Sequence, residues 1–234
     1  MKNLMQYGVV LVSILSIPGC GRLADWGKDM FYQGHQLNNS AQVVQRYIRS
    51  VRIYDQFSTC AIFDAIWLAD QVREVYAAIN SERFGKQEDH AKAFLRRQLE
   101  ENSHFISFYV LSLYEVALGS QDSEWSIFLR INGINIFPRE IKSIELPHEY
   151  QYFFGKKYTR FKVPYIITFD AKDLNENYLI RPENKEVMLC FRSSYKEGTM
   201  VWKIDIQGHS IPTIPGYRQY EQYVHDAPVC TVVE

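Results

Sequence analysis

Apolar residues recur at helical spacing along the first half of the chain, downstream of an apolar N-terminus. Three helices are predicted there. The first covers residues 40–51 with Ser40 as its N-cap, and the second begins at Ser58 or Thr59 and continues to Ile79. The third covers residues 87–102 and carries opposite charges four residues apart, which is typical of a solvated helix face.

The apolar period then changes, and strands are predicted. Residues 105–118 are apolar on both faces, as in a central strand. Residues 125–131 alternate and lead into Asn132 and Gly133, a pair typical of a two-residue hairpin turn. Pro164 lies inside another strand pattern and, because proline donates no hydrogen bond, predicts an edge strand or a bulge there. The remaining strands are predicted over residues 139–146, 159–169, 185–193 and 199–206.

This order predicts an α+β fold, with an N-terminal segment of about three helices followed by an antiparallel, β-sandwich-like domain. At least six strand candidates follow one another without a helix pattern between them, which favours antiparallel pairing. The predicted organisation is a signal peptide at 1–19, a tether at 20–39, a helical region at 40–103, an antiparallel β domain at 104–207 and an extended tail at 208–234.

The N-terminus has the arrangement of a secretory signal peptide. Lys2 and the free amine form a short positive region, and residues 7–17 form an uncharged, mostly aliphatic stretch. This stretch is short for a membrane span, and polar residues and a proline interrupt it. An uncleaved anchor helix is the alternative interpretation.

Ile17-Pro18-Gly19-Cys20 resembles the lipobox of bacterial lipoproteins, with an aliphatic residue three positions before the cysteine and a glycine directly before it. The resemblance covers the first twenty residues. It implies transfer of diacylglycerol to the Cys20 thiol, cleavage before Cys20 and acylation of the new amine. Two or more acyl chains anchor a protein stably. Gly21, in place of the aspartate that retains enterobacterial lipoproteins at the inner membrane, implies the periplasmic face of the outer membrane.

Charge and composition narrow the choice of partners. The formal net charge of −1 gives no electrostatic signature of nucleic-acid binding and predicts no polybasic membrane patch. The expected partners are the membrane, through the lipidated Cys20, and an envelope protein, with no nucleic acid. Aromatic residues make up 15% of the chain, which favours strands and core packing, with a binding surface as the alternative.

Three cysteines remain once Cys20 is assigned to lipidation. Cys60 lies in a helix pattern, Cys190 in a strand pattern and Cys230 near the C-terminus. Three cysteines cannot all pair within one chain. We expect these cysteines to act as small, buried hydrophobic residues. A disulfide from Cys230 to one of the others is the alternative, which an oxidising compartment permits.

The sequence contains no recognised catalytic motif, and no catalytic residue, cofactor or metal site is predicted from it. Two acidic loops, residues 119–125 and 169–177, could supply calcium ligands, although such residues also form ordinary turns. The histidines lie far apart and show no ligand spacing: His35, His90, His104, His148, His209 and His225.

Asp64 and Asp70 fall on the strongly apolar second helix, where a buried carboxylate needs a partner. Arg73 follows Asp70 by three residues and is expected to pair with it along the helix. A helix-packing pair is the main interpretation, and a functional acid is the alternative.

Three functions are compatible with these features. The favoured hypothesis is a non-catalytic envelope lipoprotein whose β domain binds a partner protein or supports its assembly near the membrane. A periplasmic hydrolase would need a pocket that gathers His, Asp or Glu only in the fold. A small-ligand or carbohydrate-binding module would need exposed aromatic side chains, and burial of Trp125 and Trp202 would remove its main support.

Overall fold

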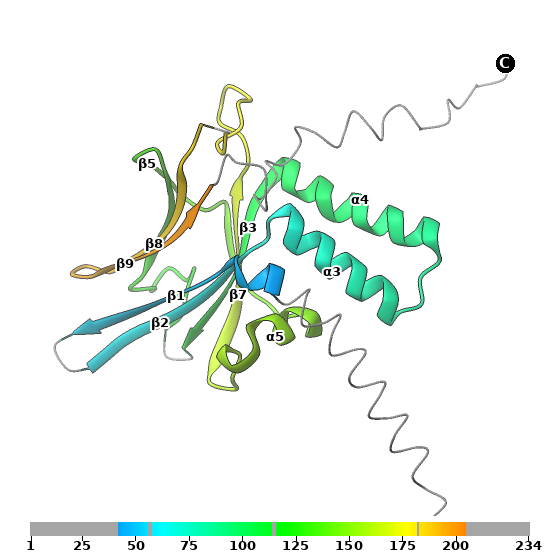
Figure 1. Ribbon diagram of the computed structural model, residues 1–234. Coiled ribbons are helices and arrows are strands. Elements are labelled where there is room, and N and C mark those ends of the chain that lie inside the picture. The colour runs from blue at the N-terminus through cyan, green and yellow to red at the C-terminus, as the bar shows by residue number, and fades with distance from the viewer. Residues whose placement is uncertain (1–41, 56–57, 114–115, 182, 205–234) are drawn as a thin grey trace, which may run out of the picture. The chain divides into compact units, whose positions relative to one another are not determined.

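Nine strands form two antiparallel sheets in the computed structural model, which describes residues 42–55, 58–113, 116–181 and 183–204 (Figure 1). The five-stranded sheet contains, in spatial order, β1 (Ile48–Asp55), β2 (Ser58–Trp67), β3 (Phe105–Leu113), β7 (Lys162–Asp170) and β6 (Glu140–Ser143). The four-stranded sheet contains, in spatial order, β5 (Ile134–Ile136), β4 (Ser126–Ile131), β8 (Glu186–Arg192) and β9 (Glu197–Lys203).

Helices cover one face of the five-stranded sheet, and the four-stranded sheet covers the other (Figure 1). The chain passes from β2 into α3 (Asp70–Arg83) and α4 (Glu88–His104) before it returns to the sheet as β3. It passes from β6 into α5 (His148–Phe154) and the 3-10 turn η1 (Gly155–Lys157) before β7. One helical turn, at residues 42–45, precedes β1.

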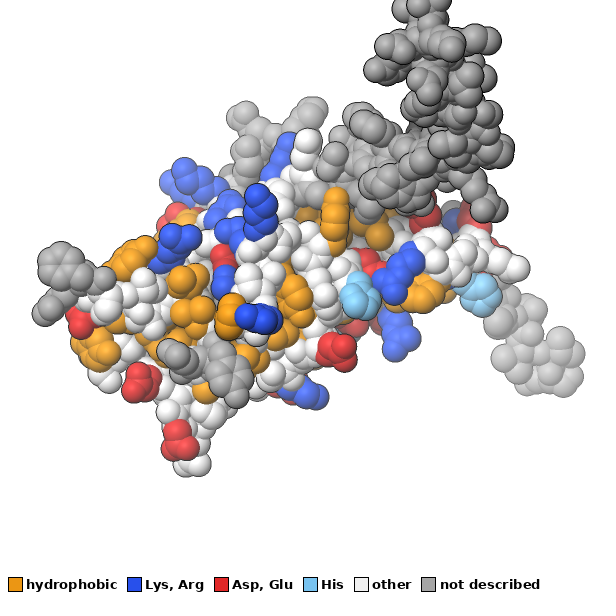
Figure 2. All heavy atoms as spheres, turned by 90° about the horizontal axis from the view of Figure 1, so that it is seen from below, with side chains coloured by type: hydrophobic (Ala, Val, Ile, Leu, Met, Phe, Trp, Pro, Cys, Tyr) orange, Lys and Arg blue, Asp and Glu red, His pale blue; other side chains and the backbone are white. Residues whose placement is uncertain are grey.

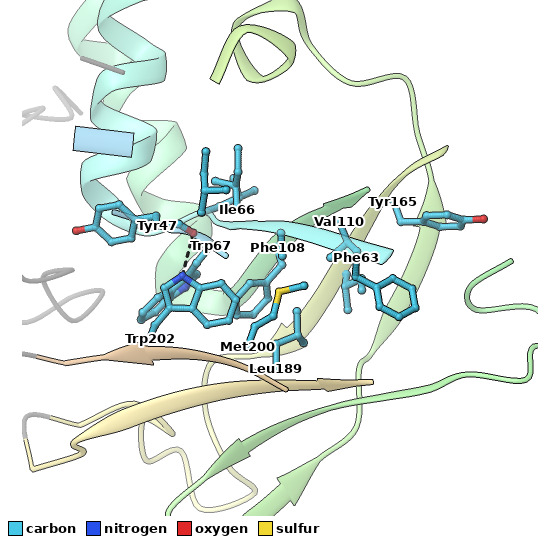
Figure 3. Packing of buried hydrophobic residues seen from close by; sticks show 14 of the residues in the cluster. Tyr47, Phe63, Ile66, Trp67, Phe108, Val110, Tyr165, Leu189, Met200 and Trp202 are labelled. Carbon is cyan, nitrogen blue, oxygen red and sulfur yellow. Dashed lines mark hydrogen bonds between the residues drawn. The ribbon is translucent and has the colours of Figure 1, made fainter. Parts of the chain in front are cut away.

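Aromatic side chains fill the space between the two sheets (Figure 3). Phe63 of β2 stacks on Phe191 of β8, with ring centroids 4.1 Å apart. Trp202 of β9 lies 5.3 Å from Phe108 of β3, and its indole N–H donates to the backbone carbonyl of Tyr47 at 2.9 Å. Because large aromatic surfaces dominate core energetics, this layer joins the two sheets into one core.

A second apolar layer lies between the five-stranded sheet and the helices. Tyr150 of α5 is fully buried and stacks on Tyr76 of α3, with ring centroids 4.8 Å apart. Tyr150 also meets Tyr109 of β3 edge-on at 4.7 Å. The central strands are therefore buried on both faces, and the predicted central strand is confirmed as β3.

The predicted order of helices first and strands second is wrong. Within the part of the chain that the structure describes, β1 and β2 precede α3 and α4. Of the first predicted helix, 40–51, the structure describes only residues 42–45 as a helical turn, after which the chain enters β1. β2 packs on the other sheet with one face and on the helical side with the other, so it is apolar on both faces. Such a run cannot be distinguished from a buried helix by its period alone. The second predicted helix divides into β2 and α3, whereas the third is confirmed as α4.

The hairpin turn predicted at Asn132 and Gly133 is confirmed. The two residues have φ angles of 50° and 79° and connect β4 to β5. A type I′ turn needs positive φ at both central positions, which asparagine and glycine tolerate best.

The edge strand or bulge predicted from Pro164 is wrong, because β7 pairs with β3 along its whole length without a register shift, and β6 covers its other side over residues 165–168. The Pro164 carbonyl accepts a hydrogen bond from Ile144 at 3.0 Å, just past the end of β6. In an antiparallel strand the N–H and the carbonyl of one residue point to the same neighbour, so the N–H that proline lacks would also point toward the β6 side of β7. The missing bond therefore falls at the end of a short ladder, where it disturbs little.

The leader, the tether and the tail lie outside the described residues. The lipidation predicted for Cys20 and the boundaries at 1–19, 20–39 and 208–234 therefore stay predictions. Of the helices that the structure does describe, none has the length and apolar character needed to cross a bilayer.

Candidate functional site

A buried carboxylate with two lysine partners lies where β1, β2, η1 and β7 meet. Asp64 of β2 is 3% exposed and lies opposite Ser50 of β1 in the strand register. Ser50 donates its hydroxyl to Asp64, and Lys162, at the start of β7, donates to the other carboxylate oxygen. Lys157 of η1 places its ammonium 3.3 Å from Asp64 Oδ1 and 2.6 Å from Ser50 Oγ. The cluster therefore fastens η1 and the start of β7 to the sheet.

The two lysines keep Asp64 ionised. Burial alone would raise the pKa of Asp64, but hydrogen bonds from Lys162 and Ser50 and the charges of Lys162 and Lys157 outweigh burial, so the pKa lies below its ordinary value. The sequence placed Asp64 on a helix, whereas the structure places it on β2. Its lysine partners come from 93 and 98 residues away, and no local signal identifies them.

The chain after α5, residues 155–162, is here called the basic segment. Two of its lysines bind Asp64, whereas Lys156 and Arg160 are exposed and form no ion pair with any residue that the structure describes. Phe161 is 61% exposed, and the Arg160 guanidinium lies 4.8 Å from the centre of its ring. The segment therefore presents cations and an aromatic ring together at the surface.

The basic segment is a local departure from the near-neutral charge of the chain. The chain contains no Asp or Glu between Glu149 and Asp170, and this stretch carries four basic residues. Arg52 of β1 is exposed and lies on the same sheet face as Ser50, two residues further along the strand. Figure 2, the view from below, shows Lys and Arg side chains gathered beside hydrophobic ones. The near-neutral net charge therefore conceals a local cationic surface.

A second polar network joins α3 to α4. Asn102 donates its side-chain amide to Asp70 Oδ1 at 2.7 Å and accepts from Arg73 Nε at 2.7 Å. Arg73 is buried and also pairs with Glu101 at 2.6 Å. Asp70 and Arg73 thus meet through a shared partner on another helix, rather than through the expected pair along one helix. These contacts favour the helix-packing interpretation of Asp70.

Asp70 titrates closer to neutrality than an ordinary aspartate. Burial raises the pKa of Asp70 to about 6, and the nearby Glu74 carboxylate adds to the increase. The hydrogen bond from Asn102 and the charge of Arg73 offset only part of this effect. The protonation of Asp70 is therefore coupled to the packing of α3 on α4.

The two described cysteines, Cys60 and Cys190, form no disulfide with each other. Cys60 lies on β2 and is partly exposed, so its predicted helical position is wrong. Cys190 of β8 is buried, with its sulfur 3.7 Å from Thr199 Oγ1, and burial raises the pKa of its thiol. A raised pKa lowers thiol reactivity. Cys230 lies outside the described residues, so its disulfide stays an alternative.

The second acidic loop forms turn contacts rather than a gathered ligand set. Asp170 pairs with Arg139 at 3.0 Å, and Asp173 Oδ1 accepts the backbone N–H groups of Asn175 and Asn177. Across the described ranges, no group of three or more His, Cys, Asp or Glu is placed to hold a metal ion. The three described histidines lie at helix ends: His90, His104 and His148.

The two tryptophans that would decide the carbohydrate hypothesis are buried. Trp125 is 8% exposed and Trp202 is 2% exposed, and both belong to the hydrophobic core. They offer no stacking surface for a sugar ring, so that hypothesis loses its main support.

A pocket of about 260 Å³ lies beside the β4–β5 turn. Its charged lining residues are two carboxylates and two cations: Glu183, Glu186, Arg130 and Lys185. It gathers two of the glutamates that the hydrolase hypothesis would accept, but no His or Asp. Apart from the turn residues Asn132 and Gly133, it brings together none of the residues that the sequence singled out.

Comparison of the chain with protein-family models, with curated proteins and with solved structures gives no match.

Proposed function

We propose that the protein is an envelope lipoprotein, anchored to a membrane through Cys20, whose folded body acts by binding or assembling a partner protein rather than by catalysis. The observation that carries the proposal is the sequence Ile17-Pro18-Gly19-Cys20 at the end of an uncharged aliphatic stretch. A thiol at this position is the nucleophile that lipid transfer requires. The proposed location is the periplasmic face of the outer membrane.

The use of buried charge in the body supports an interaction role. Asp64 binds two lysines, Arg73 binds Glu101, and Glu149 of α5 binds Arg83 of α3 at 2.9 Å. Each of these contacts joins different elements, so the buried charges hold the fold together. The cations Lys156 and Arg160 and the ring of Phe161 lie at the surface instead, where a partner can reach them.

Palmitate labelling in a bacterial host tests the anchor. We expect the parent chain to incorporate label and to lose residues 1–19, and Cys20→Ala to remain an unlabelled precursor. Cys60→Ala is the matched control, because it removes a thiol from the body and should leave labelling and cleavage unchanged. Persistent labelling of Cys20→Ala would overturn the lipobox assignment.

Affinity capture after crosslinking in the native envelope tests the interaction role. We expect the labelled chain to retain the same partner protein in repeated captures, and Cys20→Ala to lose it because the body is no longer held at the membrane. Substrate turnover by the purified protein, with no partner recovered, would contradict the proposal and favour the hydrolase.

A further inference from the structure

We propose that the basic segment, residues 155–162, binds the headgroups of an anionic lipid bilayer and gives the body a second contact with the membrane. This inference rests on the proposed function, which brings the body close to a bilayer through Cys20. It adds which face of the body turns toward the lipid.

The side chains of the segment suit a charged membrane surface. Lys156 and Arg160 are exposed cations without an ion-pair partner among the described residues, so their charge is free to attract anionic headgroups. Phe161 lies between basic neighbours and is mostly exposed. An aromatic ring beside cations is typical of interfacial segments, where the ring enters the acyl boundary and the charges stay among the headgroups.

Two ion pairs give the segment a defined shape. Lys157, in its first half, and Lys162, its last residue, both pair with Asp64. Within it, Tyr158 N–H donates to the Gly155 carbonyl and Lys162 N–H to the Thr159 carbonyl, at 3.1 and 3.0 Å. A preorganised loop loses little conformational freedom on binding, which favours a surface contact of few residues.

The distance from the proposed anchor permits this contact. Cys20 and Val43, where the body begins, are separated by 23 positions, and an extended chain of that length reaches at most about 80 Å. The basic segment can therefore meet the bilayer that holds the lipid. The tether also raises the effective concentration of the segment at the surface, so a weak second contact suffices.

A fluorescence reporter in the full chain tests the contact. Phe161→Trp places the reporter in the segment, and Phe137→Trp is the matched control because Phe137 is 68% exposed and lies beside Phe128 of the four-stranded sheet. Vesicles of phosphatidylcholine are compared with vesicles of equal parts phosphatidylcholine and phosphatidylglycerol, each with brominated acyl chains. Because the chain already contains four tryptophans, each variant is compared with the parent chain on the same vesicles. We expect quenching and a blue shift beyond those of the parent for Phe161→Trp, only on the anionic vesicles, and neither for Phe137→Trp.

Charge removal tests the electrostatic part. In the Phe161→Trp background, Lys156→Gln with Arg160→Gln should weaken the anionic-vesicle response by about fivefold for each cation removed. Lys185→Gln with Lys203→Gln removes the same charge from exposed positions next to β8 and on β9 and should leave the response unchanged.

Three results would overturn the inference: equal quenching on neutral and anionic vesicles, no effect of the Lys156 and Arg160 substitutions, or an equal effect of the control pair. A reporter response to soluble polyglutamate without a response to anionic vesicles would assign the segment to an acidic protein. The reporter at residue 161 responds to lipid contact of the basic segment, whereas palmitate labelling reports on Cys20. A chain that takes up no palmitate but keeps the reporter response would refute the anchor and still support lipid binding by the basic segment.

Discussion

Asp64 is the residue at which separate parts of the chain converge, and its substitution gives the first stability prediction. Asp64→Asn leaves the ammonium of Lys162, whose side chain is 11% exposed, without its counter-ion. Removing one partner of a buried ion pair costs about 3–5 kcal/mol, because the other charge stays desolvated. We expect the free energy of unfolding at pH 7, measured in urea, to fall by about 3 kcal/mol.

Two further variants separate this effect from general damage. Asp64→Asn combined with Lys162→Met should recover part of the loss, since the buried charge is then absent. Asp170→Asn, which breaks the exposed pair with Arg139, should change stability by less than about 1 kcal/mol. Equal losses for Asp64→Asn and Asp170→Asn would show that Asp64 contributes no more than a surface pair.

For Asp64, the sequence predicts only part of the site. An aspartate inside an apolar run predicts a buried carboxylate that needs a partner. The sequence does not say which cation supplies it, because Lys157 and Lys162 reach Asp64 only through the pairing of β2, β3 and β7. The exposed cations of the basic segment are visible in the sequence, but only the fold shows that they stand at the surface while their neighbours are bound.

At the scale of elements, the sequence correctly predicts the helices and hairpins that carry a distinctive local signal, such as a turn pair or a charged helix face. The β4–β5 hairpin follows from Asn132-Gly133, and α4 follows from its charged face. The period of β2 does not distinguish it from a buried helix, because its apolar residues face both the second sheet and the helical side. α3 begins at Asp70 with Ala69 as an N-cap that makes no side-chain hydrogen bond, so its start carries little signal.

The packing of α3 on α4 gives a prediction about pH. The pKa of Asp70 is about 6 in the folded protein, against 3.8 for an ordinary aspartate such as that of the unfolded chain. Between pH 3.8 and pH 6 the folded state therefore binds more protons than the unfolded state. Stability from this group is therefore complete below about pH 4 and is lost as the pH rises through 6. We expect urea unfolding to show a loss of roughly 2–3 kcal/mol from pH 4 to pH 7 that Asp70→Asn lacks.

The comparison is made as the difference between parent and variant at each pH, since other groups titrate in the same range. Asp89→Asn, an exposed residue in the first turn of α4, is the control and should follow the parent curve. A parent and an Asp70→Asn variant with parallel curves between pH 4 and pH 7 would show that burial does not shift the titration of Asp70.

At the scale of the whole body, the two sheets depend on each other. Each buries one face against the other, and the close approach of β9 to β1 leaves no space for a side chain at Gly198, where a Cβ would lie 2.6 Å from Ile53. Neither sheet can separate without exposing the shared aromatic layer to water. Because this exposure would cost much of the stability of both sheets, we expect the body to unfold in one cooperative step.

Trp202→Ala tests this cooperativity. The substitution removes a buried indole and its hydrogen bond to the Tyr47 carbonyl, which should cost about 3–5 kcal/mol. Each sheet carries one described cysteine, Cys60 on β2 and Cys190 on β8, so pulsed thiol labelling in urea with mass spectrometry follows the two sheets separately. We expect both midpoints to fall together. Tyr195→Ala, at an exposed position of the β8–β9 loop, should leave both midpoints nearly unchanged, whereas a fall at Cys190 alone would show that the four-stranded sheet unfolds independently.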